Sequence, residues 1–286
     1  MSAKRRKKAR RLKESKPAPP RYRRHLRATF AVLAGAAIAV AALVIFSPPG
    51  QSLKGMLTST SEGPPRAAIL DQLDLTFPNP AFAQASTSIL EQAGYAVDYY
   101  RGPEVTVELY RNLPKKDYDL VILRVHAGLV EEIDQTRGSE TLTDYVSLFT
   151  GERYSDSKYV EEVKMGPLGI AMTDEDAPKY FGIGPKFIES RMNGKFDDTT
   201  VILMGCDGLR SDRTARAFVD RGVGTFISWD KSVSATHTDE ATEALLRHLL
   251  IEDHSTAEAV QQTMAEAGPD PTFGSELRFY PREEES

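Results

Sequence analysis

One histidine and one cysteine in this 286-residue chain each follow an apolar run of strand length. His126 ends "YDLVILRVH", and Cys206, the only cysteine in the chain, ends "TTVILMGC". A thiol is nucleophilic when it ionises, and a nearby imidazole favours that form and can later protonate a leaving amine. Because no second cysteine is present, Cys206 forms no internal disulfide and is a free thiol, an intermolecular link or a nucleophile.

Backbone N–H groups beside these two residues predict an oxyanion hole. Glycines allow the backbone to approach closely, and Gly128 and Gly205 flank the pair. We therefore expect the N–H of Cys206 and that of Ala127 or Gly128 to stabilise a developing oxyanion. Asp207 would oppose ionisation of the thiol, so we expect it to cap the following helix or to touch substrate.

The elements that must position this pair are strands and helices in alternation. The sequence predicts strands at 67–73, 95–100, 118–128, 199–209, 224–229 and 276–280. It predicts helices at 82–94, 104–113, 211–222 (with Ser211 as the cap), 236–251 and 255–268. This alternation is typical of an α/β fold, a three-layer sandwich with a mostly parallel central sheet. Sites in such sheets form beyond the carboxyl ends of the strands, where both His126 and Cys206 are expected.

The same two residues also have a purely structural interpretation. A cysteine near a strand end is most often a small buried hydrophobic residue, and a lone histidine there is most often a hydrogen-bonded structural residue. Their equivalent positions after two core strands favour the functional interpretation. The absence of a G-x-S-x-G motif argues against a serine hydrolase.

The stretch "DLVILRVHAG" followed by "TTVILMGCDGL" resembles the caspase-like fold of the clan CD cysteine peptidases, in which one apolar strand ends in His-Gly and a later one in the nucleophilic Cys. The continuation "RTARAFVDRGVGTFISWDKSVSATHTDEATEALLRHLL", with "STAEAVQQTMAEAG" and "ELRFY", is similar to the CHAT branch of that clan. The resemblance covers residues 67–281.

The resemblance implies that His126 is the general base and acid, that Cys206 is the nucleophile, and that a protein or peptide is cleaved through a thioester. It also implies a substrate pocket at Trp229 and Asp230, for which the alternative is a core tryptophan followed by a turn aspartate. Ala127 departs from the family, which usually has glycine after the histidine. The segment between the two catalytic positions is long, and we expect an insertion at 129–198 that forms a lid or an extra recognition surface.

The N-terminus predicts attachment to a membrane. Residues 1–27 hold thirteen Lys and Arg against one acidic residue, and residues 28–46 contain no charge. Nineteen residues at about 1.5 Å each just span a bilayer core, and Pro48 and Pro49 end the helix. We expect a retained signal anchor rather than a cleaved signal peptide, with the basic tail in the cytoplasm and a 47–66 linker leading to an extracytoplasmic domain at 67–286. A nucleic-acid or nuclear-targeting patch is the alternative explanation of the basic residues.

The net charge and the motifs of residues 67–286 argue against several classes of partner and cofactor. Residues after 27 carry a formal net charge of −17, which disfavours nucleic acid as a partner. No cofactor motif is present: "GIG" at 182–184 is too short for a phosphate loop, and "TDEDAP" at 173–178 is more typical of a solvated turn than of a calcium site. His237, His248 and His254 show no metal-ligand spacing, so no metal is expected.

Taken together, the sequence predicts a membrane-anchored, caspase-like cysteine endopeptidase. The main alternative is a catalytically inactive caspase-like module that binds a protein or peptide partner. A flavodoxin-like ligand-binding domain, with Cys206 in the core and His126 elsewhere, is the second alternative. The sequence makes no prediction of the oligomeric state.

Overall fold

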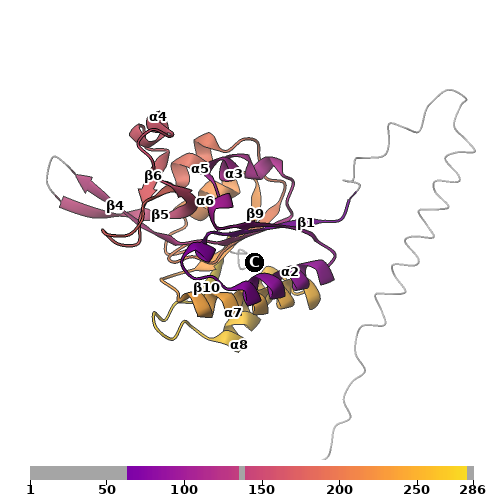
Figure 1. The fold of residues 1–286 in the computed structure, drawn as a ribbon. Helices are drawn as coiled ribbons and strands as arrows, with labels where there is room; N and C mark the ends of the chain where they lie inside the picture. Colours follow the sequence, from indigo (N-terminus) through magenta and orange to yellow (C-terminus); the bar gives the residue numbers. More distant parts are fainter. Residues whose placement is uncertain (1–62, 135–138, 282–286) are drawn as a thin grey trace, which may run out of the picture. The chain divides into compact units, whose positions relative to one another are not determined.

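A computed structural model describes residues 63–134 and 139–281 of the chain (Figure 1). The basic tail at 1–27, the expected span at 28–46 and most of the 47–66 linker lie outside the described residues. Within the described part, none of the helices has the length and apolar character needed to cross a membrane.

A six-stranded sheet forms the centre of the domain, in the order β10-β9-β8-β3-β1-β2. All neighbours pair in parallel except β10, which runs antiparallel to β9. The α/β fold with a mostly parallel central sheet is thus confirmed. The strands are β1 (Arg66–Asp71), β2 (Ala96–Arg101), β3 (Leu120–Arg124), β8 (Thr199–Leu203), β9 (Val223–Trp229) and β10 (Leu277–Tyr280).

Helices cover both faces of this sheet, and Figure 1 shows the resulting layers. One layer holds α2 (Pro80–Gln92), α7 (Ala235–Leu246) and α8 (Thr256–Ala267); the other holds α3 (Val107–Asn112), α5 (Pro185–Arg191) and α6 (Arg213–Asp220). Alternate residues of each strand face alternate layers, as the pleat requires. On β3, Ile122 packs with the α2 layer, while Val121 and Leu123 pack with the α6 layer.

Side-chain caps begin several of these helices. Asn79 accepts a hydrogen bond from the N–H of Phe82 at the start of α2, and Ser255 and Glu258 form a capping box on α8. The expected cap of α6 is wrong: this helix begins at Arg213 with Asp212 at the cap position. The Ser211 hydroxyl donates to the carbonyl of Asp144 and accepts from the N–H of Arg213 at 3.4 Å.

A second, antiparallel sheet occupies much of the expected insertion, in the order β4-β5-β7-β6. Its strands are β4 (Ala127–Asp134), β5 (Ser139–Arg153), β6 (Leu168–Ala171) and β7 (Tyr180–Ile183), and the short helix α4 (Val160–Lys164) lies between β5 and β6. Two expected strands are wrong at their ends. The strand expected at 118–128 is divided, because β3 stops at Arg124 and β4 begins at Ala127, and the strand expected at 199–209 stops at Leu203. His126 sits at the junction of the two sheets.

Candidate functional site

Strand pairing brings the segments of His126 and Cys206 side by side. Strands β3 and β8 are neighbours, their last register pair is Leu123 and Leu203, and each candidate residue follows three positions later in the chain. Gly205 shows how tightly they pack: a Cβ at this position would lie 2.5 Å from the carbonyl oxygen of Val125 and 2.7 Å from the Cβ of Ala127. Only glycine fits there, and its absent side chain lets the two strand ends meet.

The ring of His126 packs between the turn after β1 and strand β5. Its Nε2 lies 3.0 Å from the hydroxyl oxygen of Thr76, and its ring centroid lies 5.9 Å from Phe77 and 5.4 Å from Phe149. The Thr76 hydroxyl hydrogen has an acceptor in the Leu73 carbonyl at 3.5 Å, so the hydroxyl oxygen can accept from Nε2–H. That tautomer leaves Nδ1 with a free lone pair, as a general base requires.

The thiol of Cys206 is turned toward the loop after β9. Its sulfur accepts a hydrogen bond from the N–H of Val233 at 3.4 Å and donates one to the Val233 carbonyl at 3.6 Å. The side chain is half-buried and packs against the apolar cluster of the α2 layer. Among the residues that the structure describes, no hydrogen bond joins this sulfur to the His126 ring, so the pair is not engaged in this conformation.

Electrostatics make both groups neutral at rest. Burial lowers the pKa of His126, and the positive charge of Arg124 lowers it further, so the imidazole is unprotonated at neutral pH. Burial raises the pKa of the Cys206 thiol; the Val233 N–H partly offsets this, and the carboxylate of Asp207 adds to it. Cys206 is therefore a neutral thiol and His126 a free base, rather than a preformed thiolate–imidazolium pair.

Donors for an oxyanion lie next to both side chains. The N–H of Cys206 donates to none of the described residues. Phe149 N–H donates to the His126 carbonyl at 2.9 Å, and antiparallel alternation then turns the N–H of the next residue, Ala127, away from β5. Neither Ala127 nor Gly128 has positive φ, so alanine after the histidine fits this backbone without strain.

A buried charge network, which was not predicted from the sequence, lies next to the turn that carries His126. Arg124 is fully buried and pairs with Asp71 at 2.7 Å and with Asp239 of α7 at 2.7 and 2.8 Å. It also donates to the Phe77 carbonyl at 2.9 Å. The available signal was an arginine inside the otherwise apolar run "LVILRV", because a charge buried in a strand requires counter-charges.

The three residues proposed to bind substrate are all engaged within the protein. Asp207 is buried and adopts φ +60°, and its carboxylate accepts from Ser232 at 3.2 Å. Trp229 is fully buried and donates from Nε1 to Thr238, so its indole offers no surface to a ligand in this conformation. Asp230 accepts from the N–H of Glu276 at 2.8 Å, as the turn alternative implied.

A hollow on the second sheet is separate from this pair. The cavity has a volume of about 320 Å³ and lies between β5, the β6–β7 hairpin and α5. Its lining is mixed in charge, with Lys186, Glu189 and Arg213 beside Tyr145 and Pro167. The role of the insertion as a lid or recognition surface stays a prediction.

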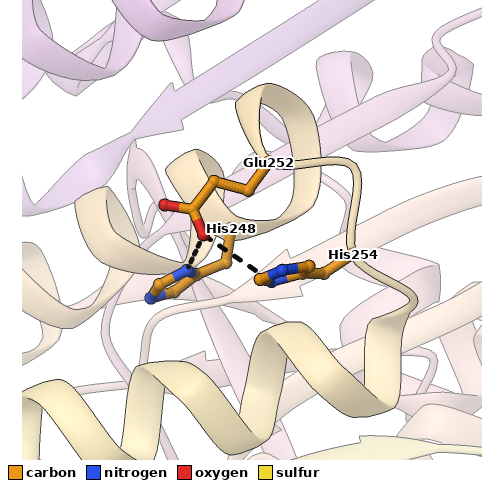
Figure 2. Close-up of side chains that lie close together, drawn as sticks. All are labelled: His248, Glu252 and His254. Atoms are coloured by element: carbon orange, nitrogen blue, oxygen red, sulfur yellow. Dashed lines mark hydrogen bonds and ion pairs between the residues drawn. The ribbon is translucent and has the colours of Figure 1, made fainter. Parts of the chain in front are cut away.

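One group of side chains corrects the expectation that no metal ligands come together. His248, Glu252 and His254 place one ligand atom each within 4.8 Å of one another, near the carboxyl end of α7 (Figure 2). The missed signal was the four-residue spacing of His248 and Glu252, which puts two side chains on one face of a helix.

Comparison of the sequence with protein-family models and with curated proteins found no match to either.

Proposed function

We propose that the domain is a caspase-like cysteine endopeptidase that uses His126 and Cys206 to hydrolyse peptide bonds. The observation that supports this most directly is their shared position: they follow adjacent parallel strands, and Gly205 holds the flanking backbones in contact. The free lone pair expected at Nδ1 of His126 and the unused N–H of Cys206 are the further groups that the reaction needs.

In the proposed reaction, His126 takes the proton of Cys206 as the sulfur attacks the carbonyl carbon of the peptide bond. The N–H groups of Cys206 and Ala127 stabilise the oxyanion. Collapse of this intermediate breaks the C–N bond, and His126 returns the proton to the leaving amine, which leaves a thioester. Water, deprotonated by His126, then attacks the thioester and releases the acid and the thiol.

Because the resting pair is neutral, substrate must help to form the nucleophile. The sulfur has to leave Val233, to which it is hydrogen-bonded, before it can meet a carbonyl carbon. We therefore expect an electrophile that carries a peptide to label Cys206 much faster than iodoacetamide does, because only the peptide provides binding energy for this rearrangement.

A single cysteine makes that experiment unambiguous, since all thiol labelling reports on Cys206. His126→Ala should slow labelling by the peptide electrophile by roughly 10²–10⁴-fold, the usual contribution of a general base. His254→Ala, a matched histidine variant in a different loop, should leave the rate unchanged. Cys206→Ser should abolish labelling and cleavage of a peptide library. Equal labelling rates in His126→Ala and the parent protein would refute the dyad.

A second candidate, the inactive module that binds a peptide partner, is favoured by one observation. The sulfur has its hydrogen bonds to Val233 and a pKa raised first by burial, as expected for a structural thiol. This candidate predicts slow labelling by every electrophile, no effect of His126→Ala, and peptide binding that survives Cys206→Ser.

We propose further that residues 28–46 anchor the protein in the cell membrane, with residues 1–27 in the cytoplasm and residues 67–286 outside it. The support is the basic tail before an uncharged span. Protease added to intact cells should then digest the domain and spare the tail. Complete protection of the domain would reverse the proposed orientation.

A further inference from the structure

We infer that His248, Glu252 and His254 form a binding site for a divalent transition-metal ion such as Zn²⁺. Figure 2 shows the carboxylate of Glu252 above the two histidine rings, which lie side by side. One ligand atom of each residue lies within 4.8 Å of the others, and Nδ1 of both histidines faces Oε2 of Glu252, at 3.1 and 3.8 Å. The site belongs to the end of α7 and is separate from the proposed dyad.

The local backbone builds this cluster in two steps. Helix α7 widens into a single π turn over Arg247–Ile251, a feature often found at functional sites, and Glu252 Oε2 comes to lie 3.1 Å from His248 Nδ1. Asp253 then adopts φ +56° and turns the chain back, so that the N–H of His254 donates to the carbonyl of His248 at 3.1 Å. The two rings are left nearly parallel, at 15° and 5.8 Å between centroids.

The other nitrogen of His248 has the partner that a metal-binding histidine usually has. Its Nε2 lies 3.2 Å from Oε2 of Glu266 on α8. Histidine ligands commonly donate their second N–H to a carboxylate, which fixes the tautomer and points the remaining lone pair at the metal. Here that lone pair, on Nδ1, would face the Glu252 oxygen, so a positive charge is needed between them.

Either a second proton on His248 or a metal ion supplies that charge, and His254 favours the metal. Its Nδ1 is buried and has no hydrogen-bond partner among the described residues. It lies 3.8 Å from Glu252 Oε2, which is too far for a hydrogen bond. A proton on His248 would leave this nitrogen unpaired, whereas one ion could bind all three groups.

The spacing and the donor types suit Zn²⁺. Bonds of roughly 2.0–2.1 Å to nitrogen and oxygen place tetrahedral ligands about 3.3 Å apart. The separations of 3.1 and 3.8 Å from Glu252 Oε2 to the two histidine nitrogens lie on either side of that value. Two imidazoles and one carboxylate disfavour Ca²⁺ and Mg²⁺, which prefer sets of oxygen ligands. The exposed side chain of Glu252 gives an ion access from solvent.

Calorimetric titration with Zn²⁺ of the full chain, first stripped with a chelator, tests the site. We expect one ion to bind. Glu252→Gln and His254→Ala should each weaken binding by more than tenfold, and Glu266→Gln by roughly 10–100-fold, as for loss of an outer partner. Glu240→Gln, an exposed change on the same helix, should have no effect, and Cys206→Ser excludes binding by the thiol.

Circular dichroism of each variant shows whether it is folded, and the visible absorption of bound Co²⁺ provides a second measurement. Tetrahedral coordination by this site should give intense bands that are lost in His254→Ala. The proposal is overturned if the parent chain binds no Zn²⁺. It is also overturned if Glu252→Gln and His254→Ala bind Zn²⁺ as tightly as the parent chain does.

Discussion

Replacing Arg124 with methionine tests whether the buried charge network holds the site together. The side chain makes four short contacts, two to Asp239, one to Asp71 and one to the Phe77 carbonyl. Methionine fills part of the volume but leaves two carboxylates, each 3 % exposed or less, without their counter-charge. Breaking a buried ion pair in this way costs about 3–5 kcal/mol. For a domain of this size, that loss lowers the melting temperature by roughly 6–20 °C.

Urea unfolding followed by circular dichroism measures this loss. Adding Asp239→Asn to the Arg124→Met variant removes one unpaired charge, so the double variant should regain part of the lost free energy of unfolding. Arg213→Met breaks an exposed pair with Asp144 at 2.6 Å and should have a much smaller effect, because solvent screens that pair. A loss below about 1 kcal/mol for Arg124→Met would show that the network does not hold β1, β3 and α7 together.

Three further predictions follow from single positions. Gly205→Ala should destabilise the domain by about 1–3 kcal/mol through overpacking and should slow labelling of Cys206. Gly128→Ala should be nearly neutral, because a Cβ there would meet nothing within 4 Å. Equal melting temperatures of the two variants would contradict this prediction. The rate of iodoacetamide labelling of Cys206 should rise with pH, and its midpoint should lie above the pKa of roughly 8.5 of an ordinary thiol, because burial raises the pKa of Cys206. A midpoint near neutral pH would contradict a neutral resting thiol. Ser255→Ala should cost about 0.5–2 kcal/mol by removing the cap of α8, as measured by urea unfolding.

The lowered pKa of His126 also sets the direction of one pH effect on stability. Its folded pKa lies below the unfolded value, so the stability that it contributes is present above about pH 6.5 and is lost as the pH falls through the folded pKa. Burial of the ring is the main reason why the folded state resists protonation, and the positive charge of Arg124 adds to it.

Local signals were sufficient to predict the central sheet. Most of the strands are near-continuous apolar runs, and glycines mark the ends of several helices between them, although the cap expected at Ser211 was wrong. The second sheet was harder to predict because polar residues interrupt its strands β4 and β5, and because β4 follows β3 after a break of only two residues. That break occurs where the N–H of His126 donates to the side chain of Gln72 instead of to a neighbouring strand.

Two features of the candidate sites could not be predicted from the sequence: contacts between residues far apart in the chain, and the backbone conformation of single residues. The partners of Arg124 lie 53 and 115 residues away in the chain. Its place in the apolar stretch "LVILRV" therefore indicated that acidic partners are needed, but not which residues they are. His254 joins His248 only because Asp253 adopts positive φ, which sequence spacing does not reveal. The contact between the segments of His126 and Cys206, by contrast, follows from their equivalent positions on neighbouring strands.

The loop that holds the thiol explains why the proposed enzyme would rest in a neutral state. Val233 lies between Ser232, which donates to Asp207 at 3.2 Å, and Ser234, whose N–H and hydroxyl donate to Asp270 at 2.9 and 2.6 Å. Burial opposes ionisation of Asp270, but these and further hydrogen bonds outweigh it and lower its pKa to about 2. Burial is the largest cause of the raised pKa of Cys206, and the carboxylates of Asp207 and Asp270 raise it further. The charges that fasten the loop therefore suppress the thiolate, and displacement of the loop by a bound peptide would release the sulfur and weaken that suppression in one step.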